Sequence, residues 1–292
     1  MRLIELEQLK YLNIMKNNNN YSCYICNNLG SYLFTVKKKE LFKCNKCDLV
    51  WIENFEQPNY ANYHNDSTYR DCKNLFDNIF SRIVNLSEKY QSRKGKVFEI
   101  GASVGGLLMA FKESGWKVSG VEPSEEAQKE AILKGIDVKN GSFENIKLKP
   151  SSYDLVIINH TLEHVDDPLE VLKKIKLVLK PKGLLVVGVP NFASFKSIFL
   201  KDKWTHILPS EHKWQYSPKS LNLLISKAGF ETLNVSTASG IFEHRNPLKE
   251  LFNALVGMKK RFITNLLSLP IDAFETYFGY GEGMLLVAKK KY

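Results

Sequence analysis

Short apolar runs alternate with amphipathic segments between residues 96 and 190, and this alternation constrains the fold more than any other feature of the sequence. The apolar runs predict β-strands at 97–100, 118–121, 155–158 and 184–189, with a further short strand beginning at 137–138. The segments between them predict helices at 107–114, 125–134 and 169–179. Strands separated by helices of this length form βαβ units and a parallel sheet, so we expect an α/β fold that binds ligands at the carboxyl ends of its strands.

A glycine-rich turn, EIGASVGG at 99–106, follows the first predicted strand and opens a helix. Glycine at such a turn lets the backbone approach a ligand that side chains would keep away. Glu122 ends the second predicted strand, 21 residues after Gly101, where an acidic residue suits a ribose diol. Such a turn is weak evidence when taken alone, and it does not match the G-x-G-x-x-G of nicotinamide sites.

The core at roughly residues 75–290 resembles the class I S-adenosylmethionine-dependent methyltransferases. The resemblance rests on ordered motifs: VFEIGASVGG at 97–106, VSGVEPS at 118–124, GSFENI at 141–146, YDLVIINHTLEHVDDP at 153–168, LKPKGLLVVGVPN at 179–191 and GMLLVAKKK at 283–291. It implies a Rossmann-like seven-stranded sheet that ends in an antiparallel strand, with S-adenosyl-L-methionine as cofactor. The alternative is a cofactor-free domain of the same fold.

The resemblance also implies a role for particular residues. Gly101 and Gly105 are expected to approach the methionine part of the cofactor, Glu122 to hold the ribose, Phe143 to flank adenine, and Asn159 to lie beside the sulfonium. The remaining expected cofactor contacts are Glu99, Ser103, Pro123, Ser142 and His160. Ser103 stands where the family has its middle glycine, and Ser142 stands where it has the acid that takes the adenine amino group. Both departures are expected to weaken cofactor binding.

Four of the five cysteines form two matched pairs, Cys23-x2-Cys26 and Cys44-x2-Cys47, with 17 residues between the pairs. This spacing is typical of a four-cysteine zinc site, in which two tight turns supply four thiolates in a tetrahedron. Four protein ligands leave no open position for water, so the zinc is predicted to be structural. Cys72 stands alone and is interpreted as a free thiol or a small apolar residue.

The sequence divides into an N-terminal appendage at 1–20, a zinc module at 21–56, a helical linker or substrate lid at 57–95, and a methyltransferase domain at 96–292. The composition is 44% hydrophobic and 25% charged, which excludes a disordered chain, a collagen and a coiled coil. Glu5 and Glu7 interrupt the position of a signal-peptide core, and no apolar run approaches the roughly 20 residues of a spanning helix. We therefore expect a cytoplasmic protein.

The order of zinc module, tyrosine-rich segment, core and Glu-His-x3-Tyr-Ser motif resembles bacterial sugar methyltransferases, which act on nucleotide-linked sugars in antibiotic, capsule or O-antigen pathways. The resemblance implies that Tyr60, Tyr63 and Tyr216 are near the substrate, which is therefore expected to be a nucleotide-linked or polysaccharide-precursor sugar. Aromatic rings and hydroxyls suit a sugar. Tyr69 follows in the same segment and is more simply explained by packing.

An RNA methyltransferase is the alternative, because zinc modules precede some of these enzymes and the net charge is +10. Against it, NHTL at 159–162 is not the Asn-Pro-Pro-Tyr signature, and the lysines are scattered rather than gathered in a stripe. Nucleic acid is therefore not the expected partner. A non-catalytic binding module is a third possibility, which the intact glycine-rich turn opposes.

A sugar hydroxyl or an activated carbon needs to lose a proton, and histidine suits that role near neutral pH. The candidates are His160, His164, His206 and His212. His212 is the first choice because Glu211 beside it could orient the ring or contact the substrate, and His160 is the second. A helical insertion at about 241–280 has apolar residues at helical spacing. It could meet a membrane surface, and we favour packing on the core or on a second subunit.

Overall fold

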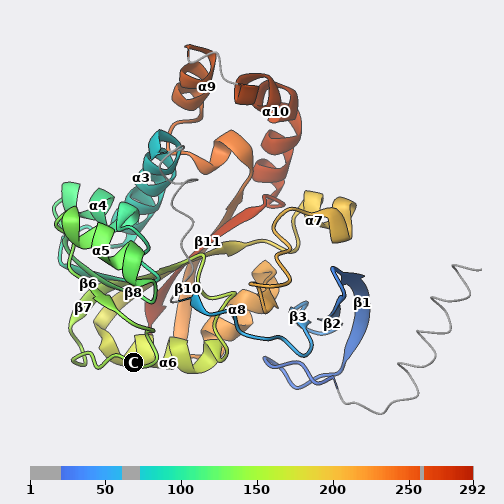
Figure 1. Ribbon diagram of the computed structural model, residues 1–292, viewed down its shortest axis with the longest axis horizontal. Coiled ribbons are helices and arrows are strands. Elements are labelled where there is room, and N and C mark those ends of the chain that lie inside the picture. Colours follow the sequence, from blue (N-terminus) through green and yellow to red (C-terminus); the bar gives the residue numbers. More distant parts are fainter. Residues whose placement is uncertain (1–20, 61–72, 257–259, 292) are drawn as a thin grey trace, which may run out of the picture.

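The computed structural model describes residues 21–60, 73–256 and 260–291, which form two β-sheets with helices around the larger one (Figure 1). The larger sheet has the strand order β10-β11-β8-β7-β4-β5-β6. Its strands are β4 (Lys96–Ile100), β5 (Lys117–Glu122), β6 (Val138–Asn140), β7 (Tyr153–Asn159), β8 (Leu179–Pro190), β10 (Phe230–Ala238) and β11 (Gly283–Lys290). The predicted α/β fold with a seven-stranded sheet is therefore confirmed.

The pairs among β4, β5, β6, β7 and β8 are parallel, whereas β11 is antiparallel to both β8 and β10. The final antiparallel strand expected at 283–291 is thus present as β11. The chain leaves β4 toward β5 and β6 and then returns to pair β7 with the other edge of β4. The connections that follow β4 and β7 therefore run toward opposite edges of the sheet. Such a reversal creates a crevice at the carboxyl ends of the two strands, and the candidate site lies there.

Helices cover both faces of this sheet because the parallel strands are apolar on both sides. Successive residues of β7 alternate between two buried clusters: Val156 and Ile158 belong to one, and Leu155 and Ile157 belong to the other. The first cluster contains residues of α6 (Pro168–Val178) and α8 (Pro218–Lys227). The second contains residues of α3 (Lys73–Tyr90), α4 (Gly106–Glu113) and α5 (Glu125–Leu133). A parallel sheet buried in this way requires the near-continuous apolar runs that predicted it.

The smaller sheet joins the N-terminal cysteine module to a distant part of the chain. Its strands have the order β1-β2-β3-β9. They are β1 (Gly30–Val36), β2 (Lys39–Cys44), β3 (Val50–Ile52) and β9 (Trp214–Gln215). In the antiparallel pair of β3 and β9, Val50 lies opposite Gln215 and Trp51 lies opposite Trp214. The sequence did not predict this strand, since two residues are too short to carry a periodic pattern.

Side-chain contacts also connect the cysteine module to the larger domain. The ring of Tyr24 lies 4.9 Å from the ring of Trp214. The Tyr24 hydroxyl donates to the carboxylate of Asp167 and accepts a hydrogen bond of 3.1 Å from the backbone N–H of Leu169. Asp167 is the N-cap of α6. The module is therefore packed against the start of a helix that contributes to the core of the larger domain.

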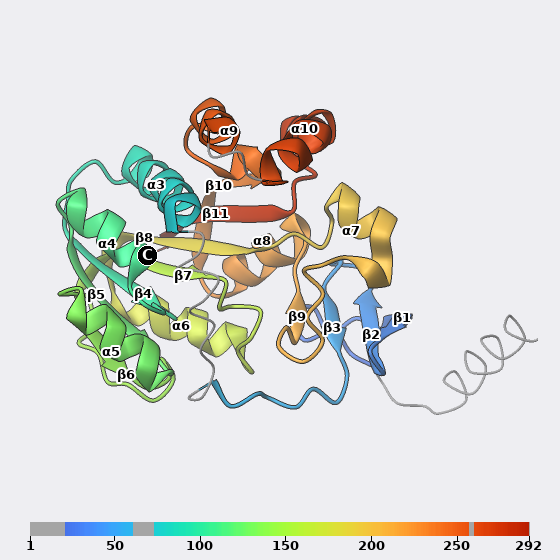
Figure 2. The ribbon, with the colours of Figure 1, turned by 45° about the horizontal axis from the view of Figure 1, so that its top comes forward.

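The insertion before β11 contains two helices, α9 (Pro247–Val256) and α10 (Lys260–Phe278), beside the β10–β11 side of the sheet (Figure 2). Buried acidic residues of α10 face the core, where the Lys196 ammonium group lies 2.9 Å from the Asp272 carboxylate. Large apolar side chains on the other faces are exposed, among them Leu248, Phe252, Ile263, Leu267 and Tyr277. No helix in the described residues is long and apolar enough to cross a membrane.

Candidate active site

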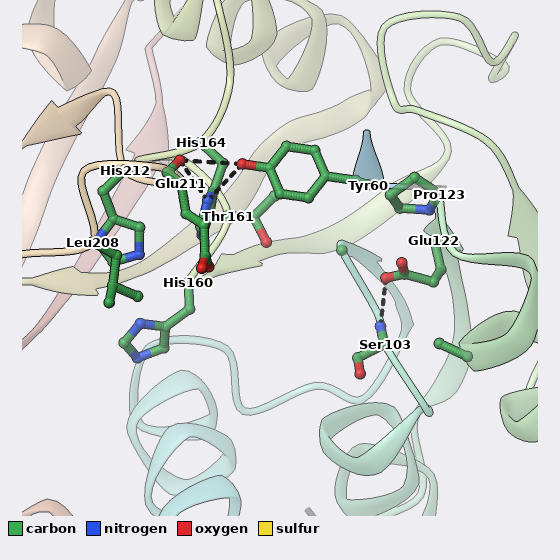
Figure 3. A pocket seen from close by; sticks show the side chains of 12 residues that line it. Tyr60, Ser103, Glu122, Pro123, His160, Thr161, His164, Leu208, Glu211 and His212 are labelled. Carbon is green, nitrogen blue, oxygen red and sulfur yellow. Dashed lines mark hydrogen bonds between the residues drawn. The ribbon is translucent and has the colours of Figure 1, made fainter. Parts of the chain in front are cut away.

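A cavity of about 340 Å³ opens at the carboxyl ends of β4, β5 and β7. Figure 3 shows its two sides, with Glu122 and Ser103 on one, the histidines on the other, and Tyr60 between them. The cavity is lined by Tyr60, Gly101, Ser103, Glu122, Pro123, Ala127, His160, Thr161, His164, Leu208, Glu211 and His212. The fold thus brings together nine of the residues that were selected from the sequence, and the first and last of them are more than 150 positions apart in the chain.

Three residues of the turn after β4 have a positive φ angle. Gly101 has a φ of +73°, and a Cβ atom there would lie 2.3 Å from Oγ1 of Thr161. Ser103 has a φ of +46° although it is not glycine. Gly105 has a φ of +76°, and its Cβ would approach Ala131 and Ile136, so it packs against α5 and does not line the cavity. Only glycine adopts such angles without strain.

Glu122 is held at the cavity wall by two backbone N–H groups. Ser103 donates a hydrogen bond of 2.8 Å to Oε2 of Glu122, and Ser124 donates one of 2.8 Å to Oε1. A carboxylate has about four lone-pair positions, and these two bonds fix the group at the wall of the cavity. The arrangement suits the two hydroxyls of a ribose.

Glu99 lies behind this wall and does not line the cavity. Its side chain is buried, and its Oε2 has no hydrogen-bond partner. Burial, and then the nearby charge of Glu122, raises the pKa of Glu99 well above its usual range. A buried carboxyl oxygen without a partner among the described residues, at the start of the glycine-rich turn, fits a cofactor that carries an ammonium group.

A second cavity of about 120 Å³ adjoins the first and shares Tyr60, Gly101, Pro123 and His164 with it. Its other walls include Gly141, Ser142, Phe143, Val165 and Val171. Phe143 is mostly buried, with the Lys174 ammonium group 4.9 Å from its ring centroid. A narrow apolar slot next to the Glu122 carboxylate fits an adenosine, so the residues present are compatible with S-adenosylmethionine.

Two histidines on the opposite wall are oriented by backbone carbonyl groups. Nδ1 of His164 lies 3.0 Å from the carbonyl oxygen of Glu211 and 2.9 Å from the Tyr60 hydroxyl. Nδ1 of His212 lies 3.0 Å from the carbonyl oxygen of His206. The two imidazole rings meet edge to face, with centroids 4.7 Å apart. His212 is therefore oriented by His206, and the carbonyl group of Glu211 orients His164.

Glu163 is buried behind these rings, with 1% of its side chain exposed, and its Oε1 lies 3.5 Å from Nδ1 of His160. Burial opposes ionisation, but contact with His160 and the charges of the neighbouring histidines lower the pKa of Glu163 to about 2. Burial lowers the pKa of His212 to about 4. Partial loss of solvent lowers the pKa of His160, but the Glu163 carboxylate outweighs this effect and the net shift is upward. His160 has a φ of +49° at the turn after β7.

Some expected site residues lie elsewhere. Tyr216 is 1% exposed and donates a hydrogen bond of 3.4 Å to the carbonyl oxygen of Leu162, so it packs in the core and lines neither cavity. Asn159 ends β7 and lines neither cavity. Tyr63, Tyr69 and Cys72 lie outside the described residues.

Sequence reasoning missed the position of Glu163, Thr161, Leu208 and Gln57 at or beside this site. Glu163 had a usable signal, since an acidic residue next to a histidine directly follows a buried strand. Thr161, Leu208 and Gln57 carry no comparable pattern, and only the fold brings them to the cavities.

The four paired cysteines converge in the N-terminal module. Their sulfur atoms all lie within 4.8 Å of one another, and Sγ–Sγ distances of 3.4 Å separate Cys23 from Cys47 and Cys26 from Cys44. A tetrahedral zinc ion with bonds of about 2.3 Å places its sulfurs about 3.8 Å apart. None of the cysteines in the described residues is in a disulfide. The cluster has the donor set and size that a zinc ion requires.

Comparisons with known proteins agree with this fold. A family model described as a methyltransferase domain matches residues 72–235, which is more than half of the chain. C-methyltransferase NovU of Streptomyces niveus is 25% identical over 72% of this chain, and the match spans 50% of NovU. A ubiquinone biosynthesis O-methyltransferase of Haemophilus ducreyi is 33% identical over 33% of this chain and 45% of that enzyme.

The crystal structure of a SAM-dependent methyltransferase from Archaeoglobus fulgidus matches with a TM-score of 0.55 at 20% identity, covering 77% of this chain and 97% of that chain. At this identity the likeness shows the fold. The seven-stranded sheet and the cavity at its carboxyl edge define the class I methyltransferase architecture. The chain belongs to the methyltransferase domain family.

Proposed function

We propose that this protein transfers a methyl group from S-adenosylmethionine to a small-molecule acceptor, most directly a nucleotide-linked or polysaccharide-precursor sugar. The observation that carries the proposal is the single cavity with a carboxylate anchor, Glu122, on one wall and the cluster of His160, His164 and His212 on the other. A reaction between two substrates requires the cofactor and the acceptor to bind in one cavity, because holding the reacting atoms in line supplies much of the acceleration.

The cofactor end is proposed to use Glu122 for the ribose, with Pro123, Ser142 and Phe143 around adenine in the adjoining slot. Gly101 and Ser103 form the turn next to the methionine part, with Glu99 behind it and His160 toward the sulfonium. Gly105 contributes indirectly, because it lets α4 begin close to α5. Bound S-adenosylmethionine supplies an activated methyl group on a positively charged sulfur.

The acceptor end is proposed to lie against Tyr60, Glu211 and the histidine cluster. The acceptor loses a proton toward this cluster while its oxygen or carbon bonds to the methyl carbon, and the electron pair of the broken S–C bond stays on sulfur. His212 is the residue to test first, because the His206 carbonyl fixes its ring. His160 is the second candidate, since its side chain is 55% exposed to the cavity side.

Support for a sugar acceptor comes from the order of modules, which resembles that of bacterial sugar methyltransferases. The C-methyltransferase NovU, which aligns with 72% of this chain, supports methyl transfer and makes carbon one candidate acceptor atom. Tyr60 places a phenol ring in the cavity between the two walls, and an aromatic face with a hydroxyl suits the mixed surface of a sugar. We also propose that Cys23, Cys26, Cys44 and Cys47 bind one structural zinc ion, which would hold the N-terminal module folded.

The testing experiment is incubation of the full chain with methyl-labelled cofactor and separate pools of nucleotide sugars, other small metabolites and RNA. Label is expected in the nucleotide-sugar pool and absent with Glu122→Ala. Label in RNA alone would overturn the small-molecule acceptor. Label in no pool, with calorimetry showing no cofactor binding by the wild type, would overturn methyl transfer itself.

A further inference from the structure

Glu163 is a buried carboxyl group at the histidine cluster. Neither of its oxygens has a hydrogen-bond partner among the described residues, and only 1% of the side chain is exposed. Its nearest basic partner is His160, at 3.5 Å. Removing a carboxylate from water costs several kcal/mol unless a positive group compensates. Two buried carboxyl oxygens without hydrogen-bond partners, close to a ring nitrogen of each of two histidines, suit the binding of a cation.

One ring nitrogen of His164 and one of His212 lie close to the Glu163 carboxyl group. One ligand atom from each of Glu163, His164 and His212 lies within 4.8 Å of the other two. Nδ1 of each histidine faces a backbone carbonyl oxygen, at 3.0 Å in both cases, and a carbonyl oxygen can only accept. Nδ1 therefore carries the hydrogen, and Nε2 keeps its lone pair. Histidines that bind metals are typically oriented in this way, by donating the other ring N–H to a carbonyl group.

We propose that Glu163, His164 and His212 bind one divalent transition-metal ion in the wall of the active-site cavity. Two imidazoles and one carboxylate suit Mn²⁺, Fe²⁺ or Zn²⁺, whereas Mg²⁺ and Ca²⁺ prefer an all-oxygen shell. Three protein ligands leave coordination positions open, and His164 and His212 both line the cavity, so the open side faces the acceptor. This site is separate from the four-cysteine cluster, whose thiolates select zinc.

The role of this ion rests on the proposed function. A hydroxyl of the acceptor bound to this ion would lose its proton more readily to His160 of the same cluster, because the positive charge lowers the pKa of a bound oxygen. The resulting oxygen nucleophile then bonds to the methyl carbon, and the S–C electron pair remains on sulfur. His212 acts in this scheme as a ligand that holds the ion.

The test is a titration of the full chain with Mn²⁺, followed by electron paramagnetic resonance, with zinc retained in the cysteine cluster. Mn²⁺ is chosen because thiolate sites bind it poorly. One Mn²⁺ per chain is expected. Glu163→Gln and His164→Gln should each weaken its binding by more than about 100-fold, the upper range for loss of a supporting group. His206→Gln is the matched control, because it removes a neighbouring imidazole, keeps the carbonyl group that orients His212, and should bind Mn²⁺ as the wild type does.

Calorimetry with S-adenosylmethionine on the same variants separates the outcomes. Variants that bind the cofactor normally are folded, so loss of Mn²⁺ from them supports the metal site. A wild-type chain that binds the cofactor and transfers methyl groups but binds no Mn²⁺ overturns the metal site and leaves the proposed function standing. A chain that binds Mn²⁺ through these residues but transfers no methyl group to any acceptor retains the site and overturns the function. If Glu163→Gln and His164→Gln both bind Mn²⁺ with wild-type affinity, the ion binds at another site and the proposal is overturned.

Discussion

The backbone N–H of Ser103 donates a 2.8 Å hydrogen bond to Oε2 of Glu122 from a left-handed conformation, with a φ of +46°. Ser103 replaces the middle glycine of the family's turn, and it adopts the backbone conformation that a glycine would have there. A non-glycine residue in this region costs about 1 kcal/mol or more, and the surrounding structure holds it there. The serine side chain is tolerated because it lies at the open cavity.

This geometry predicts opposite behaviour for two substitutions at Ser103. Ser103→Gly should leave the free energy of unfolding within about 1 kcal/mol of the wild-type value. Glycine relieves the backbone strain, and this gain offsets the greater entropy of the unfolded chain. Ser103→Val should lower the free energy of unfolding by about 2 kcal/mol, since a β-branched residue resists a positive φ. Urea denaturation of the three proteins checks both. Equal loss of stability in the glycine and valine variants would contradict the backbone explanation.

Glu122→Gln should weaken S-adenosylmethionine binding by about 10- to 100-fold, the loss expected when charge-assisted hydrogen bonds are removed. The substitution also places an amide NH₂ group, which cannot accept, against the N–H of Ser103 or Ser124. Isothermal calorimetry measures the affinity. Glu125→Gln is the matched control, because that exposed side chain pairs with Lys129 at the start of α5 and should not affect the cofactor. Unchanged affinity in Glu122→Gln would remove this carboxylate from the cofactor site.

His212→Ala should lower kcat by about 10²- to 10⁴-fold, the range for losing a group that assists proton removal. Its affinity for S-adenosylmethionine should stay near wild type, because Glu122 and the adenine slot lie on the opposite wall (Figure 3). Steady-state kinetics on the identified acceptor, with calorimetry for the cofactor, measures the two effects separately. Full turnover in this variant would transfer the assignment to His160.

Cys44→Ser should lose zinc, as measured by elemental analysis of protein purified without chelator, and should lower the thermal stability of the N-terminal module. Structural zinc contributes folding free energy of a size comparable to the stability of a small domain. Lys43→Ser is the control, since that residue precedes Cys44 and its side chain is 40% exposed. Wild-type protein that contains no zinc would refute the cysteine site.

The parallel sheet was predictable because its strands are buried on both faces, so each carries an unbroken apolar run such as LVII at 155–158. The cysteine cluster was predictable because zinc coordination imposes a short, fixed spacing. Strand β9 was not, since its two residues pair only because the cysteine module lies beside them. Tyr216 follows that strand and was expected at the substrate, but it is buried in the core. A sequence motif does not show whether a side chain is buried, because burial depends on the tertiary fold.

The histidine cluster shows the same limit at the site. The sequence indicated four candidate histidines and a glutamate beside His212. It did not indicate that backbone carbonyl groups of His206 and Glu211 orient the rings, or that Glu163 lies unsatisfied beneath them. Loop conformation decides these contacts, and it depends on long-range packing rather than on residue type.

Strand β9 begins two residues after His212 and is hydrogen-bonded to β3 of the cysteine module. We therefore expect loss of the proposed zinc ion to affect the proposed catalytic His212 through these two strands, although the two sites use different residues. A chain depleted of zinc is expected to release the loop that carries His212 while Glu122 and the adenine slot remain in place, since they belong to the larger sheet. Such a protein would still bind S-adenosylmethionine but turn over slowly, and any oxidant that attacks the cysteine thiolates would act as an inhibitor of methyl transfer without reaching the cavity.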